Sequence, residues 1–294
     1  MNMKAIYRYI VLAFCLAAAA ACVKDNRLNF VEPDHISFSG LDKVSQTTVC
    51  SAHYKVSVIK SGRNLSTAHV TLKIDNDALQ AYNEANGTSF KALPSDKYKV
   101  ETLTLDFAQS DSRLTSDLTW NPEELLATVT DDNWVIPVSL SCSEPGMVTS
   151  DRTFVIVNVR PSSIGFSAKT MEYTESKERS EVSSPVKISA SLTKSNPRDE
   201  LVVECEIDES LVTRFQDETS YYYNMPPEGC VSLKNPKATI APGDKLAEFN
   251  LSVNETLLSE IHGGHVVPIK IKSLSLEGLS ITEDVCYFII KPNF

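Results

Sequence analysis

The stretch Val70-Thr-Leu-Lys-Ile-Asp75 decides the fold, because it alternates apolar and polar residues and its ending returns later in the chain. Alternation with a period of two is typical of a strand that buries one face. Ile207-Asp208 repeats the ending 133 residues further on, and the same spacing separates Leu125 from Leu258. A spacing held over this distance indicates two copies of one domain. Such a long period excludes a solenoid and fits two independent hydrophobic cores.

A second pair of segments extends the repeat toward the end of each copy. Trp134-Val-Ile-Pro137-Val138 corresponds to His265-Val-Val-Pro268-Ile269. Pro137 and Pro268 are 131 residues apart, and so are Pro161 and Pro292, which end the two copies. One short loop of the second copy has therefore lost two residues.

Each copy is predicted to be an antiparallel β-sandwich, so the fold class is mainly β. Several short strands separated by turn residues, with small helical insertions, are typical of such domains. The architecture is immunoglobulin-like, although the Cys…Trp…Cys pattern of antibody domains is absent. The two copies are predicted to span residues 34–161 and 162–294, joined at Pro161-Ser-Ser163. Strands are predicted at Val49–Ile59, Ala68–Ile74, Val135–Leu140, Arg152–Val159, Met171–Thr174, Val186–Leu192, Leu201–Ile207, Lys245–Val253, Val266–Ile271 and Val285–Ile290. Helices are predicted at Asn76–Asn86, from Pro122 onward, and at Glu209–Asp217.

The first 21 residues are predicted to be a secretory signal peptide. Lys4 and Arg8 give it a positive start, and the apolar run that follows is shorter than the roughly 20 residues of a spanning helix. The run ends in Ala19-Ala20-Ala21-Cys22, which resembles the lipobox of bacterial lipoproteins. We therefore predict acylation of the Cys22 sulfur and a polar tether over residues 22–33. The alternative is an ordinary signal peptide that is cut near Ala21.

The tether and the net charge bear on location and partners. Asp25 resembles a short form of the acidic export signal that follows the lipidated cysteine in Bacteroidota surface lipoproteins. We predict an acyl anchor in the outer membrane, with the chain exposed at the cell surface. Removing residues 1–21 takes away Lys4 and Arg8 and no acid, which moves the net charge from −10 to −12. An acidic chain argues against nucleic acid as a partner.

Five cysteines remain once the signal peptide and the lipobox cysteine are set aside: Cys50, Cys142, Cys205, Cys230 and Cys286. An odd count outside the cytoplasm leaves at least one thiol free. Cys205 and Cys286 sit among apolar strand residues, so we expect them to be small buried hydrophobic side chains. Whether any two of the five form a disulfide stays open. No CxxC spacing occurs, so neither a redox motif nor a structural zinc site is predicted.

Three motifs of the first copy are similar to those of a known domain family. They are Val70–Asp75, then Tyr82-Asn83-Glu-Ala-Asn-Gly87-Thr-Ser-Phe90, then Leu93-Pro94. The family is a domain of unknown function in Bacteroidota cell-surface lipoproteins. It stands at the N-terminus of surface endo-β-N-acetylglucosaminidase-type glycosidases, occurs in tandem, and belongs to SusC/SusD-type glycan-uptake systems. The resemblance implies a β-sandwich in an accessory role, with no established catalytic residue.

The second copy departs from the family motif at its turn. Phe215-Gln216 replaces the Tyr-Asn pair, and Glu218-Thr-Ser-Tyr221 replaces the Asn-Gly-Thr turn. A function that family members share through this turn is therefore not implied for the second copy.

Tyr221-Tyr222-Tyr223 is the main candidate for ligand binding. Flat sugar faces stack on exposed aromatic rings, and tyrosine adds a polar hydroxyl. We expect at least one of these rings to face solvent; the alternative is that they fill the core and brace the loop before Pro226. Trp134 is a second candidate for a glycan platform, whereas Trp120 shares a face with apolar residues and is expected in the core.

No metal, cofactor or catalytic residue is predicted. Asp75-Asn76-Asp77 and Asp131-Asp132-Asn133 could offer oxygens to Ca²⁺, but neither follows the alternating calcium-loop spacing, so we interpret both as caps and turns. His262-Gly-Gly-His265 has no third ligand near it in the sequence. No GxSxG or HExxH motif occurs, and Glu123-Glu124 is expected to be solvated on a short helix.

We interpret the chain as an accessory lipoprotein of a polysaccharide-utilisation system. It would bind a polysaccharide or oligosaccharide, or hold a partner away from the membrane. The first alternative is a structural or protein-interaction lipoprotein that docks onto an outer-membrane uptake complex or an adhesin and has no sugar ligand. The second is a cryptic hydrolase, because the carboxylate pairs of glycosidases come from separate elements and spacing does not reveal them.

Overall fold

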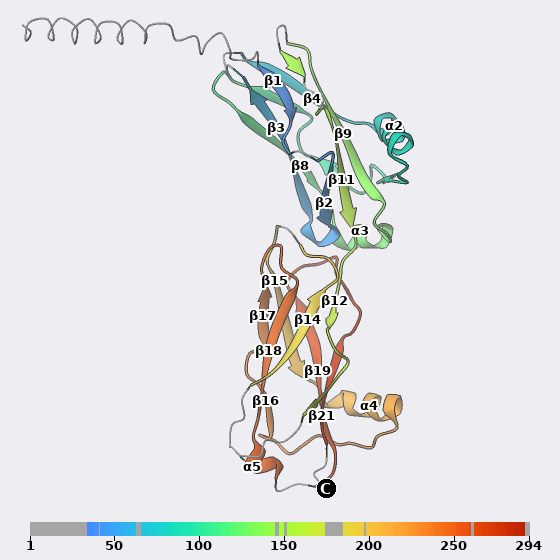
Figure 1. The fold of residues 1–294 in the computed structure, drawn as a ribbon, viewed down its shortest axis with the longest axis vertical. Coiled ribbons are helices and arrows are strands. Elements are labelled where there is room, and N and C mark those ends of the chain that lie inside the picture. The colour runs from blue at the N-terminus through green and yellow to red at the C-terminus, as the bar shows by residue number, and fades with distance from the viewer. Residues whose placement is uncertain are drawn as a thin grey trace, which may run out of the picture.

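The computed structural model describes residues 34–40, 42–62, 66–144, 147–149, 152–173, 185–196, 198–259 and 262–291. The predicted signal peptide, Cys22 and the tether lie outside these residues. Within them the chain forms four β-sheets, arranged as two β-sandwiches one after the other along the molecule (Figure 1). This arrangement confirms the predicted mainly β fold with short helical insertions.

The first sandwich pairs a sheet of order β10-β1-β3-β8-β6 with a sheet of order β2-β11-β9-β4-β7, in which β5 lies beside β9. Its strands are β1 (His35–Phe38), β2 (Val44–Thr48), β3 (His53–Ser61), β4 (Ala68–Ile74), β5 (Lys91–Ala92), β6 (Lys99–Val100), β7 (Thr104–Phe107), β8 (Arg113–Thr119), β9 (Trp134–Cys142), β10 (Val148–Thr149) and β11 (Phe154–Arg160). Most pairs are antiparallel, as predicted, whereas β1 with β10, β2 with β11 and β5 with β9 are parallel.

Among the described residues, the second sandwich repeats this topology except that it has no strand equivalent to β5. Its strands are β12 (Ser163–Phe166), β13 (Thr170–Tyr173), β14 (Val186–Leu192), β15 (Leu201–Ile207), β16 (Val231–Leu233), β17 (Lys237–Ile240), β18 (Leu246–Val253), β19 (His265–Leu274), β20 (Ser280–Ile281) and β21 (Val285–Ile290). The sheet orders are β16-β18-β14-β12-β20 and β13-β21-β19-β15-β17. Thus β12, β14 and β18 take the places of β1, β3 and β8, and β15, β19 and β21 take those of β4, β9 and β11.

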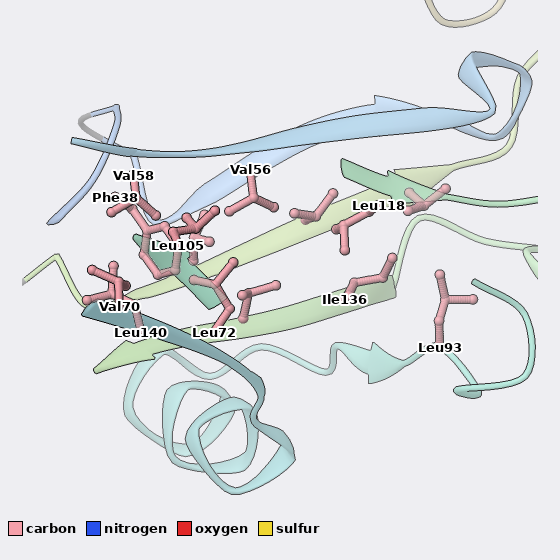
Figure 2. Close-up of a cluster of buried hydrophobic side chains, with 14 of the residues drawn as sticks. Phe38, Val56, Val58, Val70, Leu72, Leu93, Leu105, Leu118, Ile136 and Leu140 are labelled. Atoms are coloured by element: carbon pink, nitrogen blue, oxygen red, sulfur yellow. The ribbon is translucent and has the colours of Figure 1, made fainter. Parts of the chain in front are cut away.

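The core of each copy lies between its two sheets. In the first, Val56 and Val58 of β3 and Leu118 of β8 face Leu72 of β4 and Leu140 of β9 (Figure 2). Alternate residues of each strand supply this core, which is the period of two in the sequence. Full burial of one such side chain contributes about 1.5–3 kcal/mol, so the alternation fixes which face of each strand turns inward.

The first copy departs from prediction where the strand at Val49–Ile59 was expected to begin. Val49–Ser51 forms a short 3₁₀ helix, η2, and β3 starts at His53. Val49 and Cys50 are both buried. Adjacent side chains of a strand point to opposite faces, so a strand here would have turned Val49 and Cys50 away from each other. The buried Trp120 ring, predicted to lie in the core, holds this turn by donating its indole N–H to the Val49 carbonyl at 2.7 Å.

The helices follow the strands at equivalent places in the two copies. They are α2 (Asn76–Asn86) and α3 (Pro122–Thr128) in the first copy, and η3 (Glu209–Leu211), α4 (Val212–Thr219) and α5 (Glu255–Leu258) in the second. The helix predicted at Glu209–Asp217 thus starts as a 3₁₀ turn and continues to Thr219. Asp75 caps α2 by accepting the Ala78 N–H at 3.1 Å. Asp208 accepts the Ser210 N–H at the same distance, 3.1 Å.

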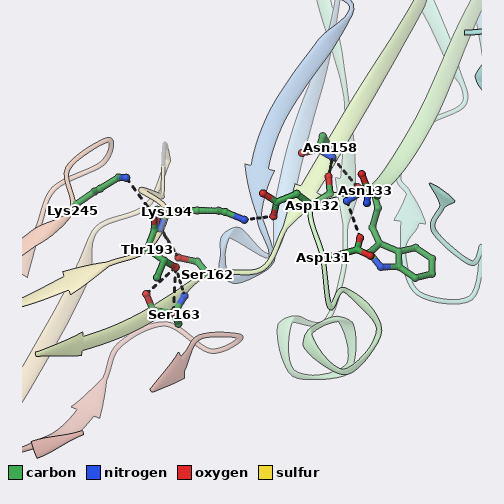
Figure 3. A network of polar contacts seen from close by, with 10 residues as sticks. Asp131, Asp132, Asn133, Asn158, Ser162, Ser163, Thr193, Lys194 and Lys245 are labelled. Carbon is green, nitrogen blue, oxygen red and sulfur yellow. Dashed lines mark hydrogen bonds and ion pairs between the residues drawn. The ribbon is translucent and has the colours of Figure 1, made fainter. Parts of the chain in front are cut away.

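The two sandwiches meet end to end through polar contacts (Figure 3). Lys194, in the loop after β14, forms an ion pair with Asp132, which lies just before β9. Deeper in the junction, the Ser51 hydroxyl donates to Oδ1 of Asn196 at 2.9 Å, and both side chains are buried. A hydrogen bond between two buried side chains ties the copies together more firmly than a surface ion pair does.

Candidate functional site

The three consecutive tyrosines lie in the loop that leaves α4, at the end of the molecule opposite to β1 (Figure 1). Ser220 ends α4 in the left-handed conformation, at φ 63°, and this turns the chain out of the helix. Tyr221 is then 59% exposed and Tyr222 84% exposed, whereas Tyr223 is partly buried. Two rings therefore face solvent and the third turns back toward the sandwich.

An aromatic stack holds one of the two exposed rings, Tyr221, in place. Tyr287 and Phe215 are buried, with ring centroids 5.1 Å apart. Phe215 stacks on Tyr223 at 6.1 Å, and Tyr223 stacks on Tyr221 at 5.5 Å with an interplanar angle of 17°. Such aromatic pairs contribute about 0.5–1.5 kcal/mol beyond their buried area. Tyr221 thus rests one face on a rigid support and leaves its other face available.

Backbone contacts fix the third tyrosine of the run. The Gln216 side-chain amide donates to the Tyr223 carbonyl at 2.9 Å, and the Val266 N–H donates to the Asn224 carbonyl at 3.0 Å. Gly264 lies directly against the Tyr223 ring, because a Cβ added there would sit 2.1 Å from Cε1. The second glycine of His262-Gly-Gly-His265 therefore makes room for an aromatic ring, whereas a Cβ at the first, Gly263, would meet no atom within 4 Å. The sequence alone did not predict this role of Gly264, because the Tyr223 ring comes from a distant part of the chain.

An ion pair lies beside the stack. Lys291 donates to Glu172 at 2.7 Å, and both side chains are more than half exposed. The hydrogen bond to Glu172 raises the pKa of Lys291, with smaller electrostatic contributions from Tyr223 and Tyr221. Flat apolar faces next to hydroxyl, ammonium and carboxylate groups offer both of the contacts that a sugar ring makes. Sequence reasoning missed this pair, which comes from β13 and the residue after β21.

Trp134 does not join the tyrosines, because it begins β9 in the first copy. It is partly buried against the first core, and the Lys91 ammonium lies 5.5 Å from its ring centroid. Lys91 also pairs with Asp131 at 3.0 Å. One face of the indole is thus covered by a cation and another side by the core, which leaves less of the ring for a glycan than at Tyr221 or Tyr222.

The oxygen-rich segments act as caps and turns. The N–H of Ala78 lowers the pKa of Asp75 by hydrogen bonding to its carboxylate, and the N–H of Asn133 does the same for Asp131. Glu123 and Glu124 are exposed, and both backbone N–H groups donate to Asn121. Within the ranges that the structure describes, no group of three His, Cys, Asp or Glu side chains could hold a metal ion.

Cys205 of β15 and Cys286 of β21 are buried, as predicted. Burial raises the pKa of Cys205 to about 12 and that of Cys286 to about 11. Cys50, Cys142, Cys205 and Cys286 are free thiols. Of the helices in the described part of the chain, none has the length and apolar composition that would let it span a bilayer.

A family model described as an N-terminal domain matches the chain twice, over residues 36–146 and 155–278. No curated protein matches the chain. Among solved structures, a candidate carbohydrate-binding protein of Bacteroides ovatus is 16% identical, over 45% of this chain and 37% of that protein, with a TM-score of 0.38. EndoBT-3987 of Bacteroides thetaiotaomicron, solved with a Man5GlcNAc product, is 21% identical over 42% of this chain and 30% of its own length, with a TM-score of 0.35. A two-domain protein of unknown function from Bacteroides fragilis is 10% identical, over 76% of this chain and 86% of that protein, with a TM-score of 0.37.

Proposed function

Because the chain belongs to this family of N-terminal domains, in two tandem copies, we propose that it is a non-catalytic module that binds carbohydrate. One observation carries the proposal: Tyr221 and Tyr222 are exposed at one end of the molecule, beside an aromatic stack that begins at the buried residues Phe215 and Tyr287. The ligand would be a polysaccharide or oligosaccharide whose sugar faces stack on these rings. Lys291 would donate hydrogen bonds to its hydroxyl groups, and Glu172 would accept hydrogen bonds from them.

The stack favours binding because it orders the Tyr221 ring before a ligand arrives. Immobilising a flexible side chain on binding costs about 0.5–1.5 kcal/mol. Tyr221 is already restrained by Tyr223, so less of this cost remains. An open surface with two rings makes fewer contacts than a closed pocket, and we therefore expect weak binding that gains from repeated sugar units in a long polymer.

The test is a glycan panel against the chain from Val23 onward, read by affinity electrophoresis and calorimetry. Tyr221→Ala combined with Tyr222→Ala should weaken binding at least tenfold, which corresponds to about 1.4 kcal/mol. The matched change to Phe at both positions keeps the stacking surface and should retain most of the affinity. Leu246→Ala, which removes an equally exposed apolar side chain from β18, serves as the control.

Two outcomes would contradict the proposal. If the wild-type chain binds no glycan of the panel, the docking role without a sugar ligand gains. If it binds but the double alanine variant binds equally well, the sugar lies elsewhere on the molecule. A melting temperature close to that of the wild type shows that the alanine variant has kept its fold.

We also propose that an acylated Cys22 anchors the chain in the outer membrane, with the sandwiches at the cell surface beside a glycan-uptake complex. The Ala19-Ala20-Ala21-Cys22 sequence supports the anchor. Each buried CH₂ of an acyl chain contributes about 0.8 kcal/mol, so two or three chains hold a protein firmly.

Replacement of the anchoring thiol tests the proposal directly. The wild-type protein, expressed in a host that acylates lipoproteins, should enter the detergent phase in a phase-partition experiment, and Cys22→Ser should move to the aqueous phase. Cys142→Ser, in β9, should leave the partition unchanged. Equal partition of the wild type and Cys22→Ser would show that the anchor is absent or lies elsewhere.

A further inference from the structure

A groove of about 730 Å³ opens where the two copies meet. The first copy supplies residues before and within β2, together with Tyr54 of β3, and the second copy supplies Arg198. This volume lies within the range of roughly 300–1,000 Å³ that is usual for small-molecule sites. The groove is remote from the tyrosines, which lie at the far end of the second copy (Figure 1). Its lining consists of Gly40, Asp42, Val44, Ser45, Gln46, Tyr54 and Arg198.

Arg198 is held in a fixed place in this groove. Its guanidinium lies over the Tyr54 ring, 4.5 Å from the centroid. Its backbone N–H donates to Oδ1 of Asn196 at 3.1 Å, and Asn196 in turn accepts the Ser51 hydroxyl of the first copy. The loop that carries Arg198 is therefore fastened to the opposite copy at two places, Ser51 and Tyr54.

The edge of the guanidinium remains open. Among the described residues, the Arg198 guanidinium has the Tyr54 ring as its contact and forms no ion pair or side-chain hydrogen bond, even though Asp42 belongs to the same lining. A guanidinium whose face rests on an aromatic ring keeps its N–H groups in one plane, where they match the two oxygens of a carboxylate.

We propose that this groove binds a sugar that carries a carboxylate, such as a uronic acid, with Arg198 taking the carboxylate. Gln46 and Asp42 would then meet the sugar hydroxyls, Asp42 as an acceptor. A bare inorganic anion gains nothing from Asp42 and is repelled by it, so the lining favours a ligand that has hydroxyl groups as well as a negative charge. The choice of a sugar rests on the proposed carbohydrate function, whereas the preference for a carboxylate rests on Arg198 alone.

The experiment follows backbone amide signals of the full mature chain during titration with galacturonate, galactose and inorganic phosphate. Galacturonate should shift Gly40, Ser45 and Gln46 of the groove, and galactose and phosphate at equal concentration should not. Signals of Tyr221 to Tyr223 report separately on the tyrosine site. A failure of the proposed carbohydrate function can therefore be distinguished from a failure of the groove proposal.

Variants separate recognition by Arg198 from a purely structural contact between the copies. Arg198→Gln should weaken galacturonate binding at least tenfold, and Arg198→Lys should weaken it as well, because an ammonium lacks the planar fork. Lys194→Gln removes the same charge from the same junction outside the groove lining and should bind normally. Should the Arg198 variants lose the fold, Gln46→Glu, which adds a negative charge in the groove, replaces them and should lower the affinity.

Three results would overturn the proposal. The first is a wild-type titration in which galacturonate leaves the groove signals unmoved. The second is an Arg198→Gln variant that binds galacturonate as tightly as the wild type does. If the Arg198 variants do not fold, the same result for Gln46→Glu counts instead. The third is displacement of galacturonate by phosphate at equal concentration, which would mean that the groove responds to charge alone.

Discussion

Gly264 supports the tyrosine site by having no side chain. A Cβ at this position would lie 2.1 Å from the Tyr223 ring, and the three atoms nearest to it all belong to that ring. The backbone there is not in the left-handed region, so it does not itself disfavour a side chain. Gly264→Ala should therefore push Tyr223 away and disturb the stacked Tyr221. We expect a loss of about 1–3 kcal/mol in unfolding free energy, the usual effect of overpacking, measured by urea denaturation.

A double variant provides the control at this site. In Gly264→Ala combined with Tyr223→Ala the clash is gone, so the loss should be smaller than the sum of the two single losses. The wild-type Gly264 Hα protons should also show an upfield ring-current shift that Gly264→Ala and Tyr223→Ala both abolish. Additive losses and an unshifted Gly264 signal would mean that the ring does not rest on this glycine.

The same residues show how far the sequence alone could reach. The run Tyr221-Tyr222-Tyr223 predicts an exposed ring, because three adjacent aromatic side chains cannot all enter one core. Which ring turns inward depends on Phe215 and Gly264, and these come from elements that only the folded chain brings together. The spacing of residues within a short stretch of sequence does not predict such contacts.

At the scale of elements, the cap of α2 is the most direct test. Asp75 accepts the Ala78 N–H at 3.1 Å, and this hydrogen bond lowers the pKa of the carboxyl group. Asp75→Ala should cost about 1 kcal/mol of unfolding free energy at neutral pH, as for other N-caps. A lowered folded pKa means that the stabilisation is present above the unfolded value of about 4 and is lost as the pH falls through the folded value. The difference between wild type and Asp75→Ala should therefore shrink in acid.

Asp75→Asn is the matched control, since it keeps an acceptor oxygen and cannot titrate. It should retain most of the stability at neutral pH, and its own cap should not weaken in acid. Equal destabilisation by Ala and Asn would show that the charge, and thus the pairing with Lys73 at 3.6 Å, matters more than the cap. An ion pair with a largely exposed lysine rarely contributes that much.

Elements with a strong period were predictable, and those set by tertiary contacts were not. β4 and β15 alternate regularly, and the structure places them as equivalent strands. The turn at Val49–Ser51 escaped prediction because its cause, the indole of Trp120, lies 71 residues away in the chain. The strands β5, β10 and β20, which pair in parallel, were missed because two-residue strands have no period to detect, whereas β13, which also pairs in parallel, was predicted at Met171–Thr174.

At the scale of the whole molecule, we predict that Asn196 sets how the two copies are oriented. Its side chain is 3% exposed, and its Oδ1 accepts from the Ser51 hydroxyl at 2.9 Å and from the N–H groups of Arg198 and Asp199 at 3.1 and 3.4 Å. Asn196→Ala leaves these donors without their acceptor, and a buried unsatisfied donor costs about 1–3 kcal/mol. We expect the copies to bend relative to each other, seen in small-angle scattering as a broader distance distribution with a changed maximum dimension.

Lys194→Ala tests whether the orientation depends instead on the ion pair with Asp132. That pair lies partly in solvent, so its removal should leave the scattering curve unchanged. If Asn196→Ala also leaves the curve unchanged, the close packing of Gly278 against Pro122, or of Arg198 over Tyr54, must fix the junction. A fixed junction has a consequence for the proposed role: it holds the tyrosine end at a constant distance from the β1 end, where the chain enters from its N-terminus. Loosening the junction would therefore lower the reach of the glycan site without changing its affinity for a free oligosaccharide.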